Sequence, residues 1–141
     1  MKTIGTCLLL LALAAALPAS AHHSFAAQYD ANKPITLNGK VTKVEWTNPH
    51  IYIYIDVPDE KTGTPVNWAL EMGGPNSLIR LGWSRNSLKQ DDMVTVEGHV
   101  ARDGSHLANA RSIVMTATGK RMLAGSSAGD AEGAPASGEG R

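Results

Sequence analysis

The chain has 141 residues, of which 43% are hydrophobic and 18% are charged, and its 13 basic residues balance its 13 acidic ones. This length suits one soluble globular domain and is too short for two domains of ordinary size. Because no basic surplus is present to neutralise phosphates, nucleic acid is excluded as the expected partner.

The first 21 residues have the three parts of a cleavable secretory signal peptide. Lys2 gives a positive start, residues 7–17 form an uninterrupted apolar run, and Ala19-Ser20-Ala21 is the small-x-small pattern that signal peptidase cleaves. The run is shorter than the roughly 20 apolar residues of a membrane-spanning helix. We therefore expect a periplasmic or secreted protein that begins at His22, is not inserted in a membrane after cleavage, and has lost its one cysteine.

The mature chain divides into three expected parts. Residues 22–34 are an N-terminal arm, residues 35–118 are a β-domain, and residues 119–141 are a flexible tail. Within the β-domain, turn residues recur at short intervals and the segments between them alternate with period two, as half-buried strands do. From Gly125 onward the tail has no large apolar residue to bury, which is typical of disorder.

The first half of the domain is expected to contain three strands. In residues 35–46 the apolar residues change phase, which predicts a bulge near Thr42-Lys43. Residues 50–57 place three isoleucines on one face, which must be the core. Residues 66–72 pair with them as a hairpin and put Trp68, Leu70 and Met72 inward.

The second half is expected to contain one helix and two strands. Asn76 caps a short helix that runs through Trp83 with an apolar stripe of Leu78, Ile79 and Leu81. Residues 93–101 and 107–117 are strands joined at Asp103-Gly104. Three strands, a helix and two strands are the element order of the OB-fold, so the expected fold is all-β: a small five-stranded OB-like barrel with one short helix between strands three and four.

Two of the five histidines, His22 and His23, would be the first residues of the mature chain. A terminal amine has a pKa of about 7.7–8.0, so a strongly binding metal can deprotonate it, and the His22 ring can then chelate the same ion. A second imidazole, for which His50 is the candidate, completes a histidine brace, and such nitrogen ligands suit Cu(II). In a competing geometry, the amine and the amide and ring of His23 bind copper without the rest of the fold.

Pairing of strands two and three is expected to put Glu71 near Tyr52 and in diagonal reach of His50. Glu71 is then either a metal ligand or the acceptor that orients the His50 ring. The alternative interpretation is an ordinary His-Glu pair on a solvated sheet face. Likewise, two histidines behind a cleavage site can lie in solvent without a role.

The remaining polar residues point less clearly to chemistry. His99 and His106 flank the Asp103-Gly104 turn, and we expect them on one face of that hairpin, mainly as surface residues. The chain contains no nucleophile elbow, no His-Glu-x-x-His helix and no phosphate-binding glycine loop, so no enzyme is expected.

Several short motifs together resemble the domain of unknown function 6152 family of small exported bacterial proteins, from His22 to about Gly125. The residues that carry the resemblance are His22-His23-Ser24-Phe25-Ala26-Ala27, Tyr29-Asp30, Val44-Glu45-Trp46-Thr47-Asn48-Pro49-His50, Trp68-Ala69-Leu70-Glu71, Gly82-Trp83 and Asp91-Asp92-Met93-Val94-Thr95-Val96. The resemblance implies export and a compact β-domain, and it implies no activity. Its motif histidines are His22, His23 and His50.

The preferred function is that of a small periplasmic metal-binding protein for copper, with His22, His23, His50 and Glu71 as the site residues. Its partners would be the metal ion and, if the ion is passed on, an envelope protein. The alternative is an OB-like adaptor without metal that binds a peptide, a glycan or an envelope protein through Tyr52, Tyr54 and Trp46. A third candidate is an enzyme that uses brace-bound copper for oxidative chemistry.

Overall fold

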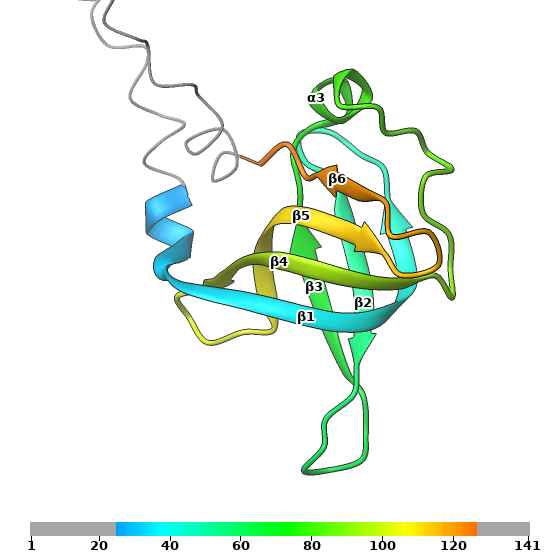
Figure 1. The fold of residues 1–141 in the computed structure, drawn as a ribbon. Coiled ribbons are helices and arrows are strands. Elements are labelled where there is room, and N and C mark those ends of the chain that lie inside the picture. The colour runs from blue at the N-terminus through cyan, green and yellow to red at the C-terminus, as the bar shows by residue number, and fades with distance from the viewer. Residues whose placement is uncertain (1–24, 127–141) are drawn as a thin grey trace, which may run out of the picture.

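The computed structural model describes residues 25–126, which form a mostly antiparallel sheet with two short helices (Figure 1). The helices are residues 25–28 and α3 (Pro75–Arg80). The strands are β1 (Tyr29–Glu45), β2 (Tyr52–Val57), β3 (Val66–Glu71), β4 (Met93–Ala101), β5 (Leu107–Met115) and β6 (Arg121–Leu123). The expected β-rich class is confirmed, but six strands are present where five were expected. The predicted signal peptide and residues 127–141 of the predicted tail lie outside the described residues.

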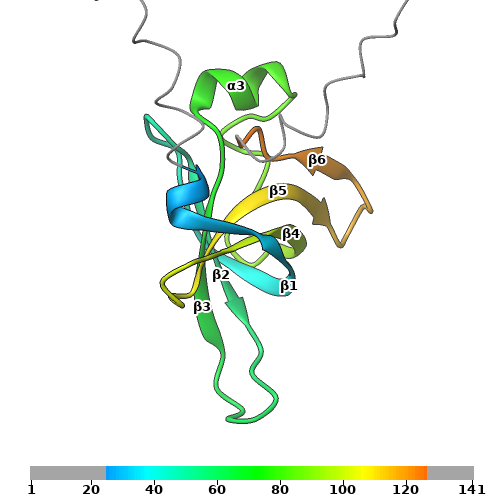
Figure 2. The same ribbon diagram turned by 90° about the vertical axis from the view of Figure 1, so that its left-hand side faces the viewer.

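The strand order is β3-β2-β1-β4-β5-β6, and β3 also pairs with β5 in parallel (Figure 2). The long strand β1 pairs with β4 along its first part and with β2 along its last part. Between Val41 and Lys43 the β1–β2 register shifts, which confirms the bulge predicted from the change of apolar phase. β1 therefore bends and serves two parts of the sheet.

The start of β1 differs from the sequence prediction. The strand begins at Tyr29 rather than Ile35, and it pairs Tyr29 with Ala101 and Pro34 with His99 at the end of β4. Tyr29 is only 1% exposed, so its side chain holds this segment against the domain. The polar residues around it had led to the prediction of an N-terminal arm for residues 22–34. This extension of β1 places the Tyr29 hydroxyl beside the Glu71 carboxylate at the end of β3.

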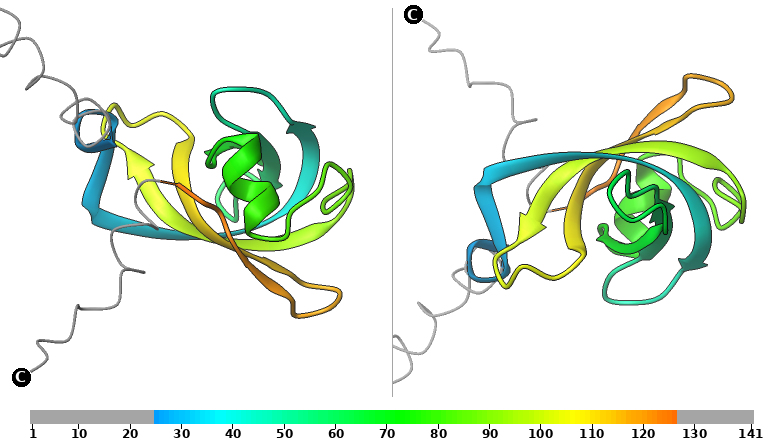
Figure 3. Two further views of the ribbon diagram at one scale, coloured as in Figure 1. Left: turned by 90° about the horizontal axis from the view of Figure 1, so that it is seen from above. Right: turned by 90° about the horizontal axis from the view of Figure 1, so that it is seen from below.

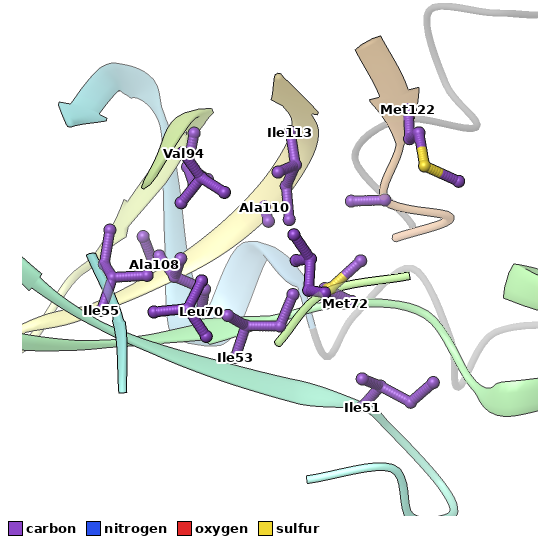
Figure 4. Packing of buried hydrophobic residues seen from close by; sticks show 14 of the residues in the cluster. Ile51, Ile53, Ile55, Leu70, Met72, Val94, Ala108, Ala110, Ile113 and Met122 are labelled. Atoms are coloured by element: carbon purple, nitrogen blue, oxygen red, sulfur yellow. The ribbon is translucent and has the colours of Figure 1, made fainter. Parts of the chain in front are cut away.

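The core lies on the inward faces of β1 to β5, and Figure 4 shows part of it. Ile51, Ile53 and Ile55 are each at most 1% exposed, as their alternation predicts, and Leu70 and Met72 join them from the β3 side. Each large aliphatic side chain that is buried in this way stabilises the fold by about 1.5–3 kcal/mol. The β2–β3 hairpin is thus fixed in register, and its outward face can carry polar residues.

α3 lies over one end of the sheet, and the β2–β3 loop projects from the other end (Figures 1 and 3). The predicted helix through Trp83 was too long: α3 ends at Arg80, and Gly82 follows with a φ of 88°. The predicted cap was also wrong, because Gly74 is the N-cap and Pro75, with its preset φ and missing N–H, takes the first turn.

So short a helix buries one apolar side chain of the predicted stripe. Leu78 is fully buried, whereas Ile79 is 57% and Leu81 is 41% exposed. Trp83 is in the core, as expected, and its indole N–H donates to the carbonyl of Leu123 at 2.8 Å.

β6 lies in a range that the sequence analysis assigned to the tail. It pairs with β5 through Ser112 with Leu123, Ile113 with Met122 and Val114 with Arg121. Met122 and Ala124 are buried, so two apolar side chains among polar neighbours are enough to hold this segment on the sheet. The folded part therefore extends past residue 118 to Ser126.

Candidate functional site

A pocket of about 340 Å³ opens between the 25–28 helix, the start of β2, the end of β3 and the segment that follows β6. Its wall combines apolar side chains with a group of polar ones. The polar side chains in this wall include His50, Glu71, Tyr29, Tyr52, Asn109 and Ser126.

Glu71 is the centre of this polar group, and it is only 6% exposed. One carboxylate oxygen, Oε2, accepts hydrogen bonds from the hydroxyls of Tyr29 at 2.5 Å and Tyr52 at 2.9 Å. The other oxygen, Oε1, lies 2.6 Å from Nδ1 of His50. A buried carboxylate needs such partners to offset its lost hydration, so the four side chains act as one unit.

The hairpin register brings this unit together as the sequence predicted. Tyr52 lies directly opposite Glu71 in the β2–β3 pairing, and His50, just before β2, reaches the carboxylate diagonally. The alternative interpretation, an ordinary His-Glu pair on a solvated sheet face, does not fit the burial of Glu71. The reason is Tyr29, which comes from the early start of β1 and covers the carboxylate.

Burial determines the protonation of the two phenols. Removal from water, and then the hydrogen bond to Glu71, raise the pKa of Tyr52 to about 12. The same causes in the same order raise the pKa of Tyr29. Both hydroxyls therefore remain protonated donors to the carboxylate near neutral pH.

Two glycines form the part of the wall where backbones come closest. A Cβ at Gly73 would lie 2.1 Å from the carbonyl oxygen of Gly125, and one at Gly74 would lie 2.8 Å from that of Pro49. The amide of Gly73 donates to Ala124 at 2.9 Å. A larger residue here would separate the end of β3 from the two segments that complete the pocket.

Phe25, the first described residue, also lines the pocket. Its ring lies 5.5 Å from that of Tyr29 and contacts that of His99 edge-on at 6.0 Å. Nδ1 of His99 is buried and has no hydrogen-bond partner within residues 25–126. His99 is thus partly buried, with Nδ1 covered and its ring packed against Phe25, rather than fully at the surface as expected.

His106 lies elsewhere, in the wall of a second pocket of about 410 Å³ beside the β2–β3 loop. Its ring lies 5.1 Å from that of Trp68. The expectation that His99 and His106 are neighbours on one face of the hairpin is wrong, because the β4–β5 connection runs from residue 102 to 106 and the register sets His99 opposite Asn109.

The aromatic surface of the adaptor hypothesis is divided in the structure. Tyr52 donates to Glu71 in the first pocket, whereas Tyr54 donates to Glu45 at 2.9 Å. Trp46 lies under the guanidinium of Arg85 at 5.9 Å. The hydroxyls of Tyr52 and Tyr54 thus already donate to side chains of the same chain.

The described part of the chain does not hold a complete metal site by itself. Between residues 25 and 126 there is no group of three or more His, Cys, Asp or Glu side chains that could hold an ion. Of the four predicted site residues, the structure brings His50 and Glu71 together, and His22 and His23 lie outside the described residues.

The helices between residues 25 and 126 are all too short or too polar to span a membrane.

Three residues of the site were missed by the sequence analysis: Tyr29, Asn109 and Ser126. Tyr29 lies in a stretch without alternation, and Ser126 lies in a segment that reads as tail. Asn109 could have been suspected from the sequence, because a polar amide stands between two alanines in a strand predicted to be partly buried.

Between residues 10 and 110 the chain matches the model of a family described as a family of unknown function, DUF6152. The match covers more than half of the sequence, so the chain belongs to this family, and the resemblance drawn from its motifs is confirmed. No match was found among curated proteins.

Proposed function

We propose that the mature protein begins at His22 and binds a copper ion with the amine and ring of His22 and the ring of His50, while Glu71 orients His50. Cleavage of residues 1–21 and a periplasmic or secreted location are part of this proposal.

The proposal also includes closure of the sheet into an OB-like barrel. The pairings β1–β2, β2–β3, β3–β5, β5–β4 and β4–β1 support that closure because they join five strands in a ring, with β6 added on β5.

The observation that carries the proposal is the contact between His50 and Glu71. Nδ1 of His50 lies 2.6 Å from the carboxylate, which leaves Nε2 as the ring nitrogen for a metal. In metal sites, a ligating histidine commonly donates its other N–H to a carboxylate, which fixes the tautomer and the ring orientation. The Glu71 side chain is itself held by Tyr29 and Tyr52, so the His50 ring is oriented before any ion binds.

The chain between His22 and Phe25 is short, so the terminal amine stays close to the pocket that contains His50. Phe25 lines the pocket with His50, and His22 precedes Phe25 by three residues. Because an extended chain spans at most about 3.6 Å per residue, the Cα of His22 lies within roughly 11 Å of that of Phe25. The amine, the His22 ring and the His50 ring then give three nitrogen ligands, a set that favours Cu(II) among the divalent first-row metals.

The test is a titration of Cu(II) into correctly cleaved protein that starts at His22, followed by electron paramagnetic resonance. We expect sub-micromolar binding with three nitrogen ligands. His50→Ala should weaken it by about 100-fold or more, because a lost ligand costs at least as much as a lost supporting residue. His106→Ala is the matched control, since His106 is exposed in the other pocket and should leave affinity unchanged.

Adding one glycine before His22 tests whether the amine and the His22 ring bind copper as one chelate. Since the extension moves the amine away from the His22 ring, it should abolish the brace, and copper that still binds through the new peptide end should be indifferent to His50→Ala. In the protein that starts at His22, tight binding that is indifferent to His50→Ala would instead favour the geometry that uses the amide and ring of His23. Absence of tight binding in the mature protein would exclude copper and favour the metal-free adaptor.

A further inference from the structure

The pocket contains two buried polar atoms that the copper proposal does not use. Asn109 is 2% and Ser126 is 3% exposed, and both line the pocket. Oδ1 of Asn109 and Oγ of Ser126 have no hydrogen-bond partner among residues 25–126. Buried polar atoms in folded proteins are nearly always paired, so two such atoms in one pocket point to an occupant.

The chemistry of the wall specifies what this occupant offers. A side-chain amide oxygen accepts hydrogen bonds and does not donate them, so the occupant must bring an N–H or O–H group to Asn109. The β3–β5 register sets Asn109 directly beside Glu71, whose carboxylate favours a positively charged neighbour. The pocket therefore fits a small segment that is rich in donors and carries an amine.

We propose that this occupant is the chain's own mature N-terminus, residues 22–24, and that Asn109 and Ser126 accept hydrogen bonds from it whether or not a metal is bound. The segment offers a terminal amine, peptide N–H groups, two imidazoles and a serine hydroxyl. It is joined directly to Phe25 in the pocket wall, so it competes with free ligands at a high effective concentration. The inference rests on the proposed function for the start at His22.

This docking makes signal cleavage the step that completes the pocket. In the precursor, Ala21 continues the chain before His22, so no terminal amine exists at that position. After cleavage, the amine is placed beside His50 and Glu71 before copper arrives. The copper site is then preorganised by the protein, which lowers the entropy cost of assembling its ligands.

The experiment compares two chains, one starting at His22 and one at Ser24, by thermal unfolding in the presence of a metal chelator. We expect the chain from Ser24 to melt about 4–8 °C lower, because one net hydrogen bond in a domain of this size shifts the Tm by that amount. Equal melting temperatures would overturn the proposal. Because no metal is present, this result is independent of whether the protein binds copper.

The variant Asn109→Ala, made in both chains, identifies the acceptor through a double-mutant cycle. It should lower the Tm more in the chain from His22 than in the chain from Ser24, and Ser126→Ala gives the same comparison if the first variant does not fold. Asn67→Ala is the matched control, since Asn67 is exposed and bonds to Asp56 at 2.8 Å, so both chains should respond equally. An equal response of both chains to the pocket variants would refute the docking.

Discussion

Two pockets lie at opposite ends of β3, and each has a histidine in its wall. In the first, His50 contacts the buried carboxylate of Glu71, which two tyrosines also hold. In the second, His106 packs against the ring of Trp68, and one of the two acidic residues in the wall, Glu60, is exposed. The two histidines differ in what orients them: hydrogen bonds around Glu71 orient His50, whereas His106 contacts the ring of Trp68.

The partner of a histidine determines what the histidine can do. A ring held by a buried carboxylate presents one defined nitrogen, which is what a metal site needs. A ring that packs at an angle against tryptophan, as His106 does, gains contact area but no fixed tautomer. If this is so, the first pocket should depend on its carboxylate Glu71 more than the second pocket depends on Glu60.

The largest expected effect is that of Glu71→Leu on the free energy of unfolding. The change leaves the hydroxyls of Tyr29 and Tyr52 and the N–H of His50 without their acceptor, and it should destabilise the protein by about 3–5 kcal/mol. Urea denaturation measures this directly. Glu60→Leu, the matched change in the second pocket, should stay within about 0.5 kcal/mol because Glu60 is exposed. Similar losses for the two variants would mean that the Glu71 network does not hold the fold.

Tyr29→Phe should have the next largest effect on unfolding. It removes one hydrogen bond to a charged acceptor and keeps the shape of the ring, so we expect a loss of about 1.5–3 kcal/mol. Tyr54→Phe provides the comparison, because Tyr54 donates to Glu45 on the outer face of the sheet and should cost about 0.5 kcal/mol or less. If Tyr54→Phe proved as costly as Tyr29→Phe, burial of the acceptor would not be the source of the difference.

Glu71→Gln tests the orienting role in copper binding, given the proposed function. The amide keeps the size of the carboxylate but holds His50 Nδ1 more weakly, and loss of such a supporting contact typically lowers metal affinity about 10–100-fold. Isothermal titration with Cu(II) gives the affinity. Glu60→Gln should leave it unchanged. Equal affinities for Glu71→Gln and the wild-type protein would remove Glu71 from the site.

Much of the fold could be read from the sequence where alternation is strong. The three isoleucines of β2 predicted its core face, and the register of β2 with β3 then predicted that Glu71 meets Tyr52 and His50. The bulge in β1 was likewise visible as a change of phase. These features are local, because side-chain direction in a strand follows directly from position.

What the sequence could not show depends on contacts between distant segments. Tyr29 is 42 positions from Glu71, and its burial comes from a β1 extension without any apolar pattern. Asn109 reaches the pocket through the parallel β3–β5 pairing, and Ser126 reaches it after β6 returns to the sheet. Each of these contacts depends on pairing between strands that are far apart in the sequence, which the alternation within one strand does not predict.

The smallest expected effect is confined to alkaline pH and again separates the two pockets. The pKa of Tyr52 is raised to about 12, first by burial and then by its bond to Glu71, while an unfolded chain ionises its tyrosines near 10.0. Because the folded state holds the proton more tightly, stability should fall as pH rises from about 10 towards 12. Ultraviolet titration of tyrosinate should show this delayed ionisation. Glu71→Gln should lower the pH at which Tyr52 ionises, since a neutral amide does not repel the phenolate as the carboxylate does. Glu60→Gln should leave that pH unchanged. Ionisation of all three tyrosines near pH 10 in the folded protein would contradict the burial of the Glu71 network.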